Sequence, residues 1–236
     1  MAGFYSFLLW YKRDKLKFLI ITAFWIMLST LVRYDGWFLF FLATVMIAFS
    51  AWKKRNWRNT EGNLFIFCAL GGLGIVLWLL WNLLIFGDPL YFAFGPYSAH
   101  SQQLQLETEG SLHTKGDWFF SAEVYFYTWL YNVGATNLAL SLLGMIALFF
   151  SRKMPGALRY ASLLLFAPLL FNILALYLGH SVIHIIGISG GKWFNVRYGV
   201  LMLPSIAIFI GVLVSALRWR YLQMTALGLL LLSNFL

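Results

Sequence analysis

The sequence predicts an all-α integral membrane protein with about seven transmembrane helices and one longer extracytoplasmic loop. Of its 236 residues, 61% are hydrophobic and only 11% are charged, whereas soluble domains carry about 25% charged residues. The apolar residues form continuous runs and do not alternate with polar ones, which favours helices over a membrane β-barrel. Aromatic residues make up 19% of the chain, which suits helices with aromatic belts at the two membrane surfaces.

Seven apolar runs are candidate spans, because a helix needs roughly 20 residues to cross a bilayer core of about 30 Å. They lie at 17–32, 37–52, 63–87, 124–150, 159–179, 198–217 and 221–236. The whole chain is therefore predicted to be a single polytopic transmembrane domain (1–236) with an outer loop at 88–123. Four asparagines inside the runs are expected to hydrogen-bond between helices. These are Asn82, Asn132, Asn137 and Asn172.

The charges predict the orientation of these spans. If the basic N-terminal stretch is cytoplasmic and the loops then alternate, thirteen of the seventeen Lys and Arg residues are cytoplasmic, as the positive-inside rule expects. Six of the eight acidic residues and all four histidines fall on the other side. Loops 33–36, 88–123 and 180–197 are then extracytoplasmic, in a multi-pass protein of the plasma or inner membrane. The net charge of +9 follows from this topology, which leaves nucleic-acid binding without support.

The two ends of the sequence resemble interrupted helices. The stretch "FYSFLLW" (4–10) is too short to span a membrane, and its basic residues follow it, unlike those of a signal peptide. The last run stops at "LLLLSNFL" without a flanking charge. We therefore expect upstream helices of a longer protein to be missing. The single cysteine, Cys68, allows no disulfide framework.

The loop that follows the third run combines turn signals with aromatic residues. Gly87 is expected to end one helix, and Asp88 with Pro89 to begin the next. The stretch "LYFAFGPY" (90–97) is too short to cross and is expected to lie in the membrane interface, followed by an exposed helix or loop over 101–109. The segment is either a structured outer loop with an aromatic belt or a lid over a lipid-linked substrate.

Arg33, Tyr34 and Asp35 lie between two apolar runs at the predicted outer boundary. Charged residues at this depth are costly unless they pair or reach the headgroups, so they are candidates for function. Arg33 and Tyr34 are candidate binding residues at this boundary, and Asp35 is a further candidate for function. The alternative is an Arg33–Asp35 turn that only caps two helices.

Arg197 and Tyr198 begin another predicted helix that enters from the outer side. A helix N-terminus favours an anion, and the planar guanidinium of arginine suits phosphate. With Lys192 of the glycine-rich "GISGGK" (187–192), these residues are predicted to bind a lipid phosphate. The alternative is an interfacial arginine that pairs with ordinary phospholipid headgroups.

His180 and His184 have the i, i+4 spacing of two metal ligands on a helix. No carboxylate lies near them in the sequence, so no metal site is assigned. A divalent cation is possible as a cofactor, but no motif indicates one.

Three motifs together resemble the multi-spanning glycosyltransferases of the GT-C superfamily, which include the protein O-mannosyltransferases and the lipid A aminoarabinose transferases. They are "RYDGW" (33–37), "FGDPLYFAFGPYSA" (86–99) and "NVRYGVLMLP" (195–204). The resemblance implies an enzyme that takes a sugar from a polyprenyl-phosphate carrier and passes it to an acceptor outside the cytoplasm. By this resemblance Arg197 would hold the phosphate and Tyr198 would brace it, with Arg33, Tyr34 and Lys192 as further substrate-binding candidates. Such a transferase also needs a carboxylate that takes the acceptor's proton, and Asp35 and Asp88 are the candidate catalytic acids.

The sequence departs from that family in one respect. The family's catalytic acid lies in a long first external loop, whereas the first external loop of this chain is only "RYDG" (33–36). The catalytic helix pair would then precede Met1, and the chain would keep the carrier-binding half. Two other functions stay open: a transporter or lipid flippase, and a non-catalytic subunit of a membrane assembly.

Overall fold

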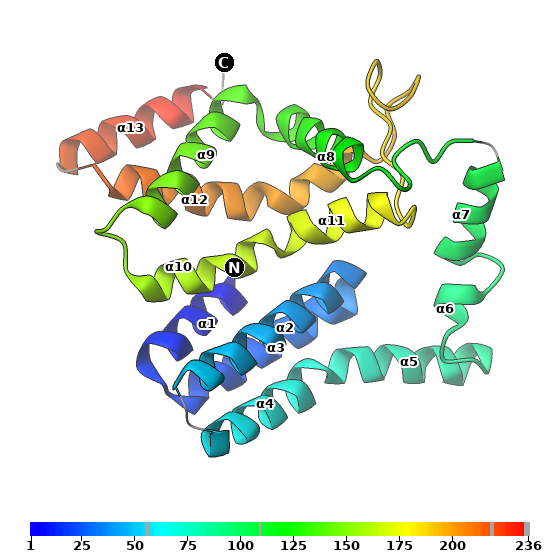
Figure 1. Cartoon of the computed structure of the whole chain (residues 1–236), viewed down its shortest axis with the longest axis horizontal. Coiled ribbons are helices and arrows are strands. Elements are labelled where there is room, and N and C mark those ends of the chain that lie inside the picture. The colour runs from blue at the N-terminus through cyan, green and yellow to red at the C-terminus, as the bar shows by residue number, and fades with distance from the viewer. Residues whose placement is uncertain (55–56, 109, 218–219, 234–236) are drawn as a thin grey trace.

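The computed structural model describes residues 1–54, 57–108, 110–217 and 220–233. These residues form helices joined by turns and loops, and no β-strand occurs among them (Figure 1). In chain order the helices are α1 (Ala2–Arg13), α2 (Leu16–Val32), α3 (Tyr34–Lys54), α4 (Trp57–Gly71), α5 (Leu73–Phe86), α6 (Tyr91–Phe94), α7 (Ala99–Thr108), α8 (Trp118–Val133), α9 (Ala135–Phe150), α10 (Gly156–Ser162), α11 (Ala167–Tyr177), α12 (Leu203–Ser215) and α13 (Arg220–Ser233), with 3₁₀ helices η1 (Leu163–Phe166) and η2 (Val196–Met202). The predicted all-α fold is confirmed.

The N-terminal half packs α1 to α4 around one apolar core. Phe7 of α1, Leu19 of α2, Ile47 of α3 and Phe67 of α4 are all fully buried in it. Residues of α10 join this core, and the Tyr160 hydroxyl donates a hydrogen bond to the Met46 carbonyl of α3. The two halves of the chain are thereby tied together through α10.

The C-terminal half is built around α8, α11 and α12, with a second core that includes Tyr125 and Leu176. The α9 helix packs closely on α12. The two backbones are so near that a Cβ atom at Gly144 would collide with the backbone carbonyl of Phe209. Glycine at this contact lets the two backbones approach, as is common where membrane helices pack. Phe38 of α3 also packs against Phe171 of α11, so the two cores belong to one helical body.

The helices that are long and apolar enough to cross a membrane number three among the described residues. They cover Thr60–Phe86, Gly156–Tyr177 and Val196–Ser215. The pair α8 and α9 makes a fourth if it counts as one broken span, and α2 and part of α3 (Tyr34–Ser50) are shorter apolar helices. Three to four candidate spans thus stand where the sequence predicted seven, on the basis of length and composition.

The prediction of one continuous helix over 124–150 is wrong. The α8 and α9 helices meet at an angle of 115°, and Gly134 joins them with φ 80° and ψ 155°. Only glycine adopts this backbone conformation readily, because other residues would bring Cβ against the backbone. The hydropathy of the sequence does not reveal the bend, because α8 and α9 are both apolar.

The connections between the helices gather at two ends of the bundle. In Figure 1, the α1–α2 and α9–α10 connections and the start of α13 lie on the left. The α2–α3 and α5–α6 connections, α7 and the segment between α11 and η2 lie on the right. The predicted cytoplasmic and extracytoplasmic segments are therefore sorted to opposite ends of the molecule.

Candidate functional site

A pocket of about 750 Å³ lies where the end of α2, the start of α3 and the end of α11 meet. The helices α6 and α7 supply another wall, and Tyr198 of η2 also lines the pocket. The volume is in the range of small-molecule sites, roughly 300–1,000 Å³. We call it the headgroup pocket. One of its sides is apolar and another is polar.

The apolar side of the headgroup pocket contains several aromatic rings. Phe92 of α6 stacks on Tyr34 with ring centroids 5.5 Å apart, and Trp78 of α5 contacts Phe92 at 6.1 Å. Leu31 and Val32 of α2 are exposed there. Such a surface accepts hydrocarbon and the apolar face of a ring.

Arg33 supplies the positive charge of the pocket. Its Nε donates a hydrogen bond to Oδ1 of Asp35 at 3.1 Å, and its guanidinium carbon lies 5.0 Å from the centre of the Tyr198 ring. The ion pair uses one nitrogen, so the Nη groups keep donors for a ligand. The two Arg-Tyr sequences, far apart in the chain, therefore meet through Arg33 and Tyr198.

Three contacts between η2 and α8 hold Tyr198 in this position. Asn132 donates to the Val196 carbonyl at 2.7 Å, and the Tyr125 hydroxyl donates to the Tyr198 carbonyl at 3.3 Å. A Cβ atom at Gly199 would lie 2.6 Å from the Thr128 carbonyl oxygen, which is below any ordinary contact. Glycine at 199 thus lets η2 lie directly against the α8 backbone.

The polar side of the pocket comes from α7 and from the segment after α11. Nδ1 of His180 lies 2.9 Å from Oε1 of Gln103, a hydrogen bond across 77 residues of sequence. His100 and Ser181 also line this side. An amide oxygen can only accept a hydrogen bond, so this contact suits the imidazole tautomer with its proton on Nδ1.

The histidine pair does not have the geometry that its spacing suggested. The α11 helix ends at Tyr177, so His180 and His184 lie in a non-helical segment. His184 is buried, its backbone pairs with that of Phe194, and its Nε2 lies 3.1 Å from the Ser111 carbonyl oxygen. The two rings have different partners, and the described residues contain no cluster of three or more metal-ligating side chains.

The remaining predicted residues lie outside the lining of the pocket. Arg197 is exposed on η2, and Lys192 is exposed with its Nζ 6.0 Å from the Phe194 ring centre. Asp88 is exposed and accepts a hydrogen bond from the Leu90 backbone at 2.8 Å. It stabilises the turn before α6, whose own N-cap is Leu90, so the expectation that Asp88 begins the next helix is corrected.

Four of the predicted residues line the pocket together: Arg33, Tyr34, Asp35 and Tyr198. Sequence reasoning missed Gln103, Phe92 and Trp78. No local signal in the sequence links Gln103 to His180, because the contact depends on how the α6–α7 segment folds back over α11.

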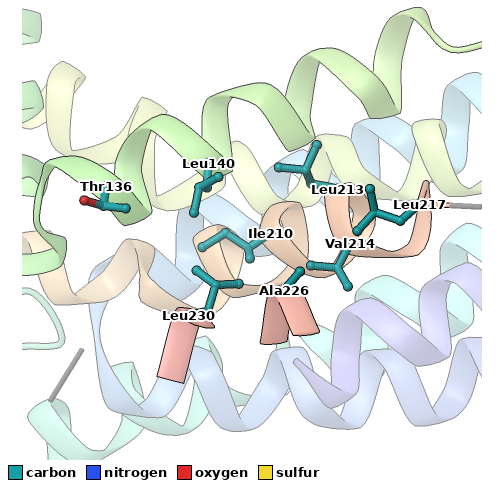
Figure 2. Close-up of a pocket in the computed structure, with 8 residues that line it drawn as sticks. All are labelled: Thr136, Leu140, Ile210, Leu213, Val214, Leu217, Ala226 and Leu230. Carbon is teal, nitrogen blue, oxygen red and sulfur yellow. The ribbon is translucent and has the colours of Figure 1, made fainter. Parts of the chain in front are cut away.

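A second pocket, of about 480 Å³, lies between α9, α12 and α13 (Figure 2). Figure 2 shows aliphatic side chains from all three helices pointing into it, with the Thr136 hydroxyl at one end. It has no titratable lining residue, so it suits hydrocarbon and offers no group for catalysis.

The comparisons with known proteins add no relative to this description. The chain matches no family model, no curated protein and no solved structure.

Proposed function

We propose that this chain is a membrane protein that binds a polyprenyl-phosphate-linked sugar in the headgroup pocket and serves sugar transfer to an acceptor outside the cytoplasm. The observation that carries the proposal is the position of Arg33, which lies over Tyr198 and beside Asp35 in a pocket with an apolar aromatic side. The proposal has the reaction type implied by the resemblance to GT-C enzymes, but it rests on Arg33 instead of Arg197.

The membrane location is supported by the length and composition of three to four helices. Many large apolar side chains on them are exposed to the surroundings, among them Phe65, Val76 and Leu84. Exposed apolar surface on this scale is unusual for a soluble monomer, and a bilayer would cover it. The sorting of basic residues to one end of the bundle supports an extracytoplasmic position for the headgroup pocket, at the opposite end.

The ligand class follows from the two sides of the pocket. An amphiphile with a long isoprenoid tail would lie along the exposed parts of α2 and α3, and its phosphate would meet the free donors of Arg33. Charge-assisted hydrogen bonds from guanidinium to phosphate are short and strong, and stacking on Tyr198 restricts the rotation of the side chain before the ligand arrives.

The transfer step would use the acid in the same pocket. The acceptor hydroxyl oxygen forms a bond to the anomeric carbon while the bond from that carbon to the phosphate oxygen breaks. The electron pair of the broken bond stays on the polyprenyl phosphate, which leaves, and the acceptor proton passes to the Asp35 carboxylate. A carboxylate near the anomeric carbon also stabilises the positive charge that develops there.

A binding experiment tests the site directly. The purified chain in lipid nanodiscs is titrated with polyprenyl phosphate, as wild type, Arg33→Ala and Arg197→Ala. We expect Arg33→Ala to weaken binding about tenfold or more, since each charge-assisted hydrogen bond contributes roughly 1.5–3 kcal/mol. The exposed Arg197 serves as the matched control, and its removal should change affinity less than threefold.

Two results would refute this assignment: an unchanged affinity in Arg33→Ala, or a larger loss in Arg197→Ala. Thermal unfolding of each variant separates a lost contact from a lost fold. Asp35→Asn then tests the transfer step in a membrane fraction that supplies the acceptor. We expect it to keep carrier binding and to lower the transfer rate roughly 100-fold or more.

A further inference from the structure

The polar side of the headgroup pocket has donors and acceptors that the phosphate does not need. Gln103 of α7 and His180 after α11 form a hydrogen bond of 2.9 Å there, and Ser181 lies next to His180. The Nε2 atoms of Gln103 and His180 have no hydrogen bond to any described residue. The amide of Gln103 is uncharged and can donate and accept hydrogen bonds, and an imidazole can also do both, whereas an anion is better served by cations.

We propose that Gln103 and His180 form a subsite for the sugar, in which they bind adjacent hydroxyls of a neutral glycosyl headgroup. This inference rests on the proposed function. It adds the residues that make the pocket bind the sugar-linked lipid more tightly than the bare carrier. A sugar hydroxyl both donates and accepts, so it matches the amide of Gln103 and the imidazole of His180. Arg33 then binds the phosphate, so the phosphate and the sugar of one ligand occupy two separate subsites of the pocket.

The two side chains come from segments that the fold fixes independently. The Ser101 hydroxyl donates to the Gly95 carbonyl at 2.9 Å, which holds the start of α7 against the end of α6. The backbone amide of His180 donates to the Ala175 carbonyl at 2.7 Å, directly after α11. A ligand therefore meets a preformed pair, which lowers the entropic cost of binding.

Aromatic rings beside this pair suit the apolar face of a sugar. Phe94 lies in the lining next to His100, with ring centroids 5.9 Å apart. Phe92 stacks on Tyr34 on the neighbouring wall. A pyranose presents hydroxyls at its edge and C–H groups on its faces, so an edge of polar groups beside aromatic rings fits both.

The test compares two lipids on the full chain in nanodiscs: polyprenyl phosphate and the same lipid with a neutral hexose on its phosphate. The variants are Gln103→Ala, His180→Ala and the control Gln102→Ala. Gln102 lies on the same helix, is exposed, and does not line the pocket. We expect Gln103→Ala and His180→Ala each to weaken binding of the hexose lipid roughly five- to tenfold, which corresponds to one lost hydrogen bond. Binding of bare polyprenyl phosphate should stay within twofold, and Gln102→Ala should change neither affinity.

The outcomes separate this inference from the function on which it rests. If the wild type binds both lipids but Gln103→Ala and His180→Ala weaken both equally, or neither, the sugar subsite is wrong and the carrier site stands. If the wild type binds neither lipid, both proposals are overturned. The thermal unfolding midpoint of each variant is the control for folding. An unfolded protein would lose binding of both lipids, so a loss confined to the hexose lipid does not come from unfolding.

Discussion

Arg33 illustrates how a single residue acquires its role from partners distant in sequence. Its neighbour Asp35 could have been a simple capping partner, and the hydrogen bond at 3.1 Å confirms that they pair. Tyr198 adds a second contact, at 5.0 Å from the ring centre. The charge is thereby held at the pocket wall by one partner that neutralises part of it and one that only orients it.

The aromatic ring at position 198, and not its hydroxyl, should orient Arg33. Tyr198→Phe keeps the ring, so we expect polyprenyl-phosphate binding within twofold of wild type. Tyr198→Ala removes a cation–π contact that contributes about 0.5–1 kcal/mol at exposed sites, so affinity should fall roughly two- to fivefold. Nanodisc titrations measure both, and equal losses in the two variants would contradict the role of the ring.

Asn132 links two elements, so its substitution should lower the free energy of unfolding more than substitution of Asn82, which bonds within one helix. Asn132 donates to the Thr128 carbonyl of its own helix and to the Val196 carbonyl of η2, both at 2.7 Å. Asn82, though buried, donates to the Trp78 carbonyl of its own helix at 2.8 Å. We expect Asn132→Leu to lower the free energy of unfolding by about 0.5–1.5 kcal/mol and Asn82→Leu to lower it less.

Thermal and denaturant unfolding in one detergent compare the two leucine variants. A larger loss in Asn82→Leu would contradict the assignment of Asn132 as the cross-link between α8 and η2. The expectation that the asparagines bond between helices holds for Asn132 and for Asn137 of α9, whose Nδ2 donates to the Val133 carbonyl of α8 at 3.0 Å. Asn82 and Asn172 instead donate to carbonyls of their own helices.

At the scale of elements, the bend between α8 and α9 determines the shape of the C-terminal half. The α8 helix ends and α9 begins at Gly134, so the bend needs no proline or inserted loop. The bend leaves α9 free to pack along α12, and α8 free to carry η2. The site and the second pocket thus depend on the same glycine.

Substitution at Gly134 should be costly because of its backbone conformation. A side chain there meets no atom within 4 Å, so the loss in Gly134→Ala would come from the φ of 80° and not from crowding. We expect a loss of roughly 1–3 kcal/mol in unfolding free energy. Gly211→Ala in α12, which also has open space around it, should be neutral or slightly stabilising, since alanine favours helix.

Spin labels on α8 and α9 would report the angle between the two helices by the distance distribution. A Gly134→Ala variant with unchanged stability and an unchanged distance would show that the backbone there does not need glycine.

At the scale of the whole molecule, the sorting of charges predicts the orientation in the membrane. Lys153 is exposed in the α9–α10 connection, and Lys192 is exposed in the segment between α11 and η2. Figure 1 shows these two connections at opposite ends of the bundle. In a Cys68→Ala background, Lys192→Cys should react with a membrane-impermeant maleimide on intact cells. Lys153→Cys should react only after the cells are permeabilised. The reverse pattern would place the headgroup pocket on the cytoplasmic side and would remove the support for an extracytoplasmic acceptor.

The sequence by itself determined the helical class, because its apolar runs are long and do not alternate with polar residues, a pattern that favours helices over strands. It also indicated Gly87 as a helix end, and the structure confirms this with φ 74°. It marked Arg33, Asp35 and Tyr198 as candidates, since charges and polar rings next to apolar runs are unusual. These features depend on neighbours in the chain.

The tertiary structure decided what no local pattern could. It replaced a single 124–150 helix by two helices at 115°, brought Arg33 to Tyr198 across the chain, and left Arg197 outside the pocket. It also joined Gln103 to His180. The physical reason is the same in each case: a residue's role at this site depends on the surface it faces, and long-range packing sets that surface.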